Sequence, residues 1–217
     1  MKVSKKTLII TSIIILLPVV FGLVMWNRLP DPMPTHFGAD GQADGWSHKS
    51  FAVFGLPLII LGAHLLCIFA SKTDPKSKNY SEKLFGLMVW LTPVLSIIVN
   101  GAMYAYALGS AIDITMLVML FTAVLFIVIG NYLPKCKHNY TLGVKLPWTL
   151  ADENNWNATH RLAGYVWMLG GMVLLINAFF FNMYVFLIVM LVMVLVPSVY
   201  SYLYYRKHGV EEKKEEE

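Results

Sequence analysis

The distribution of charged residues constrains this chain more than any other feature. No Asp, Glu, Lys or Arg occurs in residues 7–27, 50–71, 84–112, 114–134 or 162–205. A helix of about 20 apolar residues crosses the hydrocarbon core of a bilayer, so each of the first four windows holds one span. The last window is long enough for two spans, with a turn at Phe181–Tyr184. The sequence therefore predicts six transmembrane helices, at residues 7–26, 51–70, 84–107, 114–133, 162–181 and 184–204.

The composition excludes a soluble globular domain. Hydrophobic residues make up 57% of the 217 residues and charged residues 14%. Soluble domains have about 45–50% and about 25%, respectively. We therefore predict an all-α integral membrane protein, a bundle of about six transmembrane helices with a short structured outer loop and an inner interfacial helix.

Basic residues predict the orientation of these spans. Apart from Arg28 and Lys49, the 17 Lys and Arg residues lie in the N-terminus, the loops after the second and fourth spans, or the tail. Basic loops stay on the cytoplasmic side, so we expect a multi-pass membrane protein with both termini inside. Anionic headgroups attract such residues. Membrane lipids are therefore expected partners, and direct nucleic acid binding is not expected.

The loops and spans suggest four parts. Residues 1–50 hold the first span and the outer loop, and residues 51–129 hold spans two to four. Residues 130–164 form a cytoplasmic loop rich in polar and aromatic side chains, and residues 165–217 hold spans five and six and a charged tail.

Polar groups inside the predicted spans are few. The main ones are His64, Asn100 and Asn177, and we interpret them as hydrogen-bonding contacts between helices. No carboxylate or basic group lies in a span, although ion-coupled transporters usually need one. A small membrane transporter or exporter subunit, with a polar cavity lined by these three residues, is the alternative hypothesis.

The sequence gives no positive sign of catalysis. The HExxH, GxSxG, P-loop and GxGxxG motifs are missing, and with them the common hydrolytic and nucleotide-binding schemes. We predict a protein that is not an enzyme and has no cofactor. A membrane enzyme with a metal at His138 or His160 is a third hypothesis, although no ligand triad has suitable spacing.

The outer loop, residues 27–50, combines prolines with glycines and aspartates. Such residues favour extended backbone and tight turns, so we expect a compact two-stranded excursion. His36, Asp40, Asp44 and His48 match no metal-binding spacing, and no metal is predicted here. The candidate binding residues of this loop are Pro34, His36, Phe37, Gly41, Asp44 and Gly45.

The inner loop, residues 130–164, reads GNYLPKCKHNYTLGVKLPWTLADENNWNATHRLAG. Thr149 is a suitable N-cap for a helix from about Leu150, which would anchor span five and hold Trp148 and Trp156 at the headgroup level. The other interpretation is a binding surface for a cytoplasmic partner. The candidate residues are Asn131, Tyr132, Pro134, Gly143, Lys145, Pro147, Trp148, Thr149, Trp156, Thr159, His160 and Arg161.

Two motifs carry a resemblance to a known family. GNYLPK, NYTLGVKLPWTL and NW-NATHRLAG in the inner loop resemble the SdpI-like immunity protein family of Gram-positive bacteria. The outer loop, LP--MPTHF---G--DGW--K, resembles the domain of unknown function that usually precedes this motif. One departure from the pattern stands out: Lys145 and Leu146 occupy positions where Arg and Thr are more usual. Lys lacks the planar fork of Arg, which bears on recognition through that position.

The resemblance implies a function for the whole chain. Such a protein spans the membrane six times and protects the cell against a secreted, membrane-active peptide toxin. The resemblance also implies a second role, in which the inner loop draws a small winged-helix autorepressor to the membrane. The outer loop would then meet the toxin, and the inner loop would dock the repressor.

Overall fold

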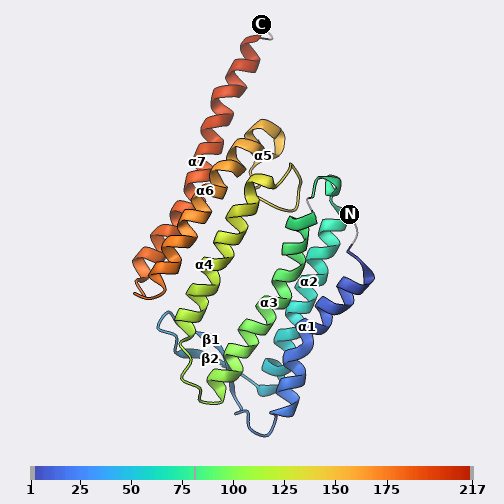
Figure 1. Cartoon of the computed structure of the whole chain (residues 1–217), viewed down its shortest axis with the longest axis vertical. Helices are drawn as coiled ribbons and strands as arrows, with labels where there is room; N and C mark the ends of the chain where they lie inside the picture. The colour runs from blue at the N-terminus through green and yellow to red at the C-terminus, as the bar shows by residue number, and fades with distance from the viewer. Residues whose placement is uncertain (1–2, 81, 216–217) are drawn as a thin grey trace. The chain divides into compact units, whose positions relative to one another are not determined.

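The structure, a computed structural model, describes residues 3–80 and 82–215. Within this part, six helices are long and apolar enough to cross a membrane, which confirms the predicted class (Figure 1). The helices are α1 (Lys5–Val24), α2 (Leu56–Thr73), α3 (Glu82–Ala107), α4 (Ile114–Tyr132), α5 (Pro147–Ala151), α6 (Glu153–Asn177) and α7 (Met183–Glu215). The strands are β1 (Met33–Phe37) and β2 (Ala43–Ser47), and single turns of other helix types lie at Phe51–Gly55, Ser77–Asn79 and Leu133–Lys135.

The chain folds as two compact units. The first unit comprises the chain up to Thr73 together with Phe85–Thr115, and so contains α1, the two strands, α2 and most of α3. The second comprises Asp74–Leu84 and the chain from Met116 onward, which holds most of α4 and the helices α5 to α7.

In the first unit, polar side chains on α3 join it to α1 and α2. His64 on α2 lies between the hydroxyls of Thr11 on α1 and Thr92 on α3, and hydrogen-bonds to both. Ser96 donates to the carbonyl oxygen of Ile15 at 2.9 Å, and Tyr104 to that of Pro18 at 3.0 Å. His64 is thus a contact between helices, as predicted.

The other two intramembrane amides bond locally. Asn100 donates to the carbonyl oxygen of Ser96 within its own helix, instead of to another helix as predicted. Asn177 donates to the carbonyl oxygen of Asn182 across the turn between α6 and α7. Both amides therefore satisfy backbone oxygens close to them in the sequence.

The two strands form the expected two-stranded excursion from the first unit. β1 and β2 are antiparallel, and irregular register on either side of His36 bends the hairpin. At its base, Met33 is fully buried in a small core with Leu29, Val53 and Met103. This core fixes the hairpin to the end of the helices.

In the second unit, glycines allow close helix packing. A Cβ on Gly164 of α6 would lie 2.6 Å from Pro134 Cδ and 2.8 Å from the carbonyl oxygen of Gly130. One on Gly171 would lie 2.8 Å from the carbonyl oxygen of Ala123. Small residues at such interfaces let helix backbones approach closely, which drives association in lipid.

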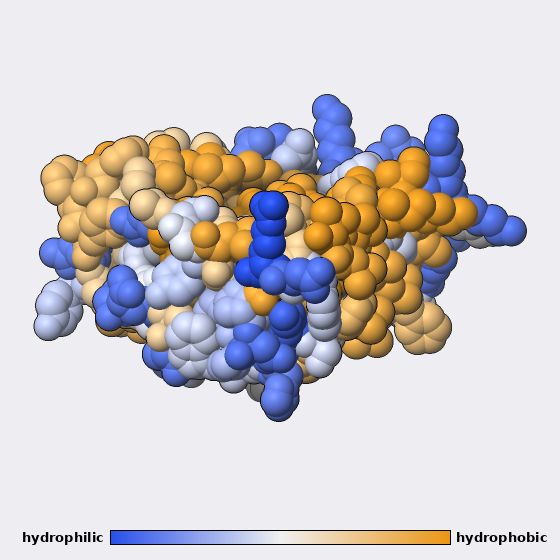
Figure 2. Space-filling view, turned by 90° about the horizontal axis from the view of Figure 1, so that it is seen from below, coloured by the Kyte–Doolittle hydropathy of each residue, from blue (hydrophilic) through white to orange (hydrophobic). Residues whose placement is uncertain are grey.

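Much of the remaining helix surface is apolar and exposed. Val24, Leu66 and Phe180 are 78%, 66% and 75% exposed. Figure 2 shows orange apolar residues covering large parts of the surface beside areas of blue polar residues. Apolar sides of this kind are expected where helices face lipid tails, since hydrocarbon solvates them well.

One predicted boundary is wrong in an informative way. The sequence predicts the fifth span at residues 162–181, preceded by a separate helix from about Leu150. Instead α6 runs without a break from Glu153 to Asn177, and only five-residue α5 precedes it. Polar residues such as Asn155 and His160 belong to the spanning helix itself, where they face protein instead of lipid.

The α4–α6 contact gives a first prediction. Gly164→Ala should destabilise the protein by about 2 kcal/mol, because the added methyl group meets a backbone oxygen and a rigid proline ring. Thermal unfolding of the purified protein in detergent measures this change.

Gly62→Ala on α2 is the matched control, since its Cβ would meet no atom within 4 Å. An equal unfolding temperature for Gly164→Ala and Gly62→Ala would contradict the proposed packing of α4 against α6.

Candidate functional site

The candidate site is the motif segment, residues 130–164, together with the loop at residues 74–80 that packs on it. Both belong to the second unit. None of the segment's residues from Cys136 to Leu146 lies in a helix or a strand. Side-chain hydrogen bonds to backbone groups hold this part in one shape.

Asp74 organises the contact between the two loops. Its Oδ2 accepts hydrogen bonds from Tyr80 OH (2.6 Å), the Thr141 hydroxyl (2.8 Å) and the Tyr140 backbone N–H (3.0 Å). Its Oδ1 accepts from the Lys76 N–H at 2.7 Å. The carboxylate is buried, and no cation in the described part of the chain pairs with it. Neutral donors alone therefore compensate the charge of Asp74.

These contacts shift two pKa values. Burial by itself raises the pKa of Asp74, but the hydrogen bonds from Tyr80, Lys76, Thr141 and Tyr140 outweigh it and leave the pKa below its ordinary value. Burial and the bond to Asp74 raise the pKa of Tyr80 to about 12. The pair therefore stays as carboxylate and phenol across the physiological range.

Trp156 and His160 form the interior of the motif segment. Trp156 is fully buried and donates from Nε1 to the Cys136 carbonyl oxygen at 2.7 Å. His160 stacks on its ring at 4.0 Å between centroids. The Val144 backbone N–H donates to His160 Nε2 at 2.9 Å, so Nδ1 carries the proton and donates to the Trp156 carbonyl oxygen. The Trp156 ring is therefore enclosed by protein, and its depth at the headgroup level stays a prediction.

Gly143 is required by this arrangement. Its φ of +108° favours glycine, and a Cβ there would overlap His160 Nε2. The chain therefore turns at Gly143 directly over the His160 ring, which places the Val144 N–H on Nε2. Both ring nitrogens of His160 are then engaged within the fold.

Two further side chains, Asn139 and Cys136, complete the interior. Asn139 accepts from the backbone N–H groups of Thr141 and Leu142 and donates to the Lys137 carbonyl oxygen. Burial raises the pKa of Cys136 to about 11, although a hydrogen bond from Asn139 acts in the opposite direction. The Cys136 thiol is therefore protonated and weakly reactive at neutral pH.

His138 links this interior to the loop at residues 74–80. The Lys76 ammonium can only donate, so it donates to His138 Nδ1 at 2.9 Å. Asn79 donates to the His138 carbonyl oxygen at 2.7 Å. Lys76 also lies over the Tyr140 ring, 5.3 Å from its centroid. The loop at residues 74–80 therefore holds both the backbone and the ring of His138.

The predicted role of Thr149 as N-cap is wrong. Pro147 begins α5, and Thr149 occupies its third position. There it accepts from the Leu146 N–H and donates back to backbone carbonyls. Asp152 is instead the N-cap of α6, where it accepts from the Asn154 N–H at 2.7 Å. Pro147 decides the start of α5, because its fixed φ suits the first helical position.

Asn155 joins the motif segment to α7. It donates to the Ser201 carbonyl oxygen and accepts from the hydroxyls of Ser201 and Thr159. The Trp148 ring also packs against α7. Its centroid lies 5.5 Å from the ring centroid of Tyr202 and 6.5 Å from that of Tyr205. Hydrogen bonds at Asn155 and ring contacts at Trp148 therefore attach the motif segment to α7.

Exposure divides the predicted residues of this segment into three sets. Thr149, Trp156, Thr159 and His160 are buried, and Tyr132 and Trp148 are half-buried. The exposed ones are Asn131, Pro134, Gly143, Lys145, Pro147 and Arg161. Sequence reasoning missed Asp74, Lys76, Asn79 and Asn139. The Asp-Pro-Lys turn after the second span was the only signal for Asp74.

The hairpin residues are separated in the same way. Pro34 and Gly41 are buried, Phe37 and Gly45 are half-buried, and His36 and Asp44 are exposed and paired with each other. Phe37 packs edge-on against Tyr106 of α3, with 5.0 Å between ring centroids. The exposed surface of the hairpin therefore combines the polar His36–Asp44 pair with the Trp46 ring, which is 54% exposed.

Comparison with known proteins gives three findings. Residues 135–201 match the SdpI/YfhL protein family, and residues 13–61 match a domain of unknown function, DUF1648. The immunity protein SdpI of Bacillus subtilis (strain 168) is 26% identical over 206 residues, covering 93% of this chain and 97% of that protein. No solved structure matches the chain significantly. The loop at residues 74–80 lies outside both matched segments.

The Asp74 network gives a second prediction. Asp74→Asn should destabilise the second unit by about 3 kcal/mol, because an amide group would then face N–H and O–H donors in a buried site. The pKa of Asp74 is lowered on folding, so its contribution is present above about pH 4 and is lost as the pH falls further. Unfolding measured against pH should show this acid-side loss in the wild type and not in Asp74→Asn.

Asp152→Asn is the matched control, because Asn also serves as an N-cap and that site should tolerate the change. Equal stabilities of the two variants at pH 7 would contradict the assignment of Asp74 as the organising residue.

Proposed function

We propose that this chain is a membrane immunity protein, because residues 135–201 match the SdpI/YfhL family and nearly the whole chain is similar to an SdpI immunity protein. It protects the cell against a secreted, membrane-active peptide toxin. The observation that carries this proposal is the match to an immunity protein over nearly the full length of both chains. Six apolar helices and a structured loop at each of two positions support the same function.

The proposed orientation places the hairpin outside the cell and the motif segment inside. The hairpin end of the first unit carries Arg28 and Lys49 as its basic residues, whereas the loops at 72–83 and 135–161 are rich in them. Basic loops are retained in the cytoplasm. In this orientation the toxin meets the hairpin first.

We further propose that the motif segment docks a winged-helix autorepressor. Its exposed side chains, among them Lys145, Pro147 and Arg161, would contact this partner. The buried residues Trp156 and His160 support these side chains without touching it. Protection and repressor docking then use different surfaces, and neither involves covalent chemistry.

A challenge assay tests this function. A sensitive Gram-positive host that expresses the wild-type chain should survive the toxin that kills the same host with an empty vector. Arg161→Ala should still protect. It should lower recruitment of the repressor to membranes by about tenfold, the loss expected for a central arginine at an interface.

Arg206→Ala removes the same side chain from α7 and is the matched control. No protection by a wild type that is shown to be inserted in the membrane would contradict the immunity function. Equal recruitment by Arg161→Ala and Arg206→Ala would contradict the docking surface alone.

A further inference from the structure

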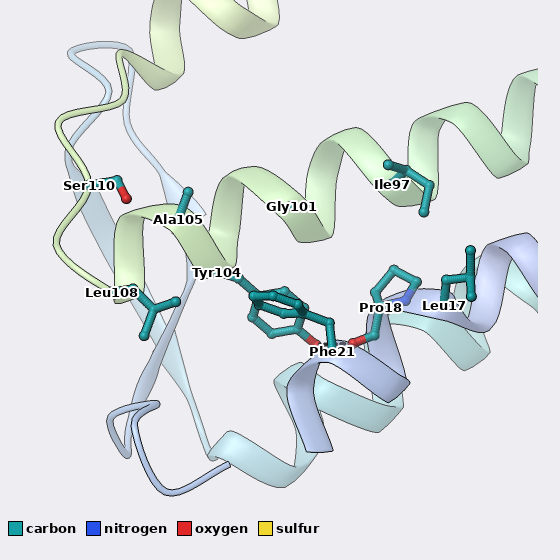
Figure 3. A pocket seen from close by; sticks show the side chains of 9 residues that line it. All are labelled: Leu17, Pro18, Phe21, Ile97, Gly101, Tyr104, Ala105, Leu108 and Ser110. Atoms are coloured by element: carbon teal, nitrogen blue, oxygen red, sulfur yellow. Dashed lines mark hydrogen bonds between the residues drawn. The ribbon is translucent and has the colours of Figure 1, made fainter. Parts of the chain in front are cut away.

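An apolar groove lies between α1 and α3 in the first unit. Its volume is about 410 Å3, and it lies toward the hairpin end of α3 (Figure 3). The lining residues are Leu17, Pro18 and Phe21 of α1, Ile97, Gly101, Tyr104 and Ala105 of α3, and Leu108 and Ser110. Of these, Phe21 and Ile97 are 45% and 41% exposed, so the groove opens sideways toward lipid.

The groove has the shape and chemistry that a helix can enter. A Cβ on Gly101 would meet no atom within 4 Å, and Ala105 follows one turn later on α3. Two small residues four positions apart are typical of close helix–helix contacts in membranes. Tyr104 OH is already bonded to the Pro18 carbonyl oxygen. The Tyr104 hydroxyl therefore keeps its hydrogen bond when an apolar group occupies the groove.

The hairpin beside the groove is acidic. It is attached next to Ala105, since Tyr106 contacts Phe37 and accepts the Ala43 N–H. Asp31, Asp40, Asp44 and Asp113 outnumber Arg28 and Lys49 at this end of the unit, a formal charge of −4 + 2 = −2. The Lys49 ammonium is held by the carbonyl oxygens of Trp26 and Leu29, which makes it a poor partner for an incoming anion.

We propose that this groove receives an apolar helical segment of the peptide toxin, with a cationic end of the peptide facing the acidic hairpin. The proposal rests on the immunity function and names its toxin-binding subsite. A phospholipid fits the apolar walls as well, but an anionic headgroup would be repelled at the acidic end. A cationic peptide is attracted there, and charge complementarity of this kind selects partners.

Filling the groove tests the proposal. Gly101→Leu should abolish protection in the challenge assay while the protein remains inserted and folded, since its side chain enters open space. Gly86→Leu is the matched control on the same helix, because a Cβ there also meets no atom within 4 Å and Gly86 does not line the groove. Equal protection by both variants would overturn the proposal.

A binding measurement separates this proposal from the immunity function. The probe is a fluorescent synthetic Leu/Ala helix with lysines at one end, added to liposomes of zwitterionic lipid that contain the full chain. Gly101→Leu should weaken binding at least tenfold relative to Gly86→Leu, and Asp40→Asn with Asp44→Asn should weaken it at low salt. Wild type that fails to protect but binds the probe in this way would contradict the immunity function alone. If Gly101→Leu binds the probe as well as Gly86→Leu does but loses co-purifying phospholipid, the groove binds lipid and the proposal is overturned.

Discussion

The free-energy cost of an unpaired polar group in hydrocarbon governs this molecule. Charged residues are excluded from long windows of the sequence. Inside the spans, His64, Asn100 and Asn177 each form a hydrogen bond to another helix or to nearby backbone, although Asn100 Oδ1 is buried without a hydrogen-bond partner in the described part of the chain. His64 bridges three helices, and Ser96 and Tyr104 bond to carbonyl oxygens of α1. These bonds connect α1 and α2 to the polar side chains of α3, which are Thr92, Ser96 and Tyr104. The apolar sides are then left to face lipid and, at Gly101, to form an open groove.

The same constraint acts at the motif segment through Asp74. A buried carboxylate without a cation needs several hydrogen-bond donors. Tyr80, Tyr140 and Thr141 donate such bonds to Asp74. Two loops far apart in the sequence are thereby fixed to each other. The match to the SdpI/YfhL family begins at residue 135, yet the fold of that segment depends on a residue far upstream. A binding surface on this segment is consequently set by both loops.

Much of the fold could be predicted from the sequence, because spans and turns depend on local composition. The six helices and the two-stranded hairpin follow from apolar length, prolines and glycines. The interior of the motif segment could not be predicted in this way. Trp156 and His160 are residue types that are common in helices at the membrane interface. In the structure, however, the turn at Gly143 covers their rings. Pairings such as Asp74 with Thr141 or Asn155 with Ser201 join residues with no local signal, so the contacts that decide burial appear only in three dimensions.

The proposed function requires two separate working surfaces: the hairpin would meet the toxin outside the cell, and the motif segment would dock the repressor inside. The most direct test is thiol labelling in intact cells with a membrane-impermeant maleimide. Ala39→Cys and Lys137→Cys are each placed in a Cys67→Ala background, where the buried Cys136 thiol stays unreactive. The account predicts labelling of Ala39→Cys on intact cells, and of Lys137→Cys only after permeabilisation. Labelling of Lys137→Cys on intact cells would contradict it.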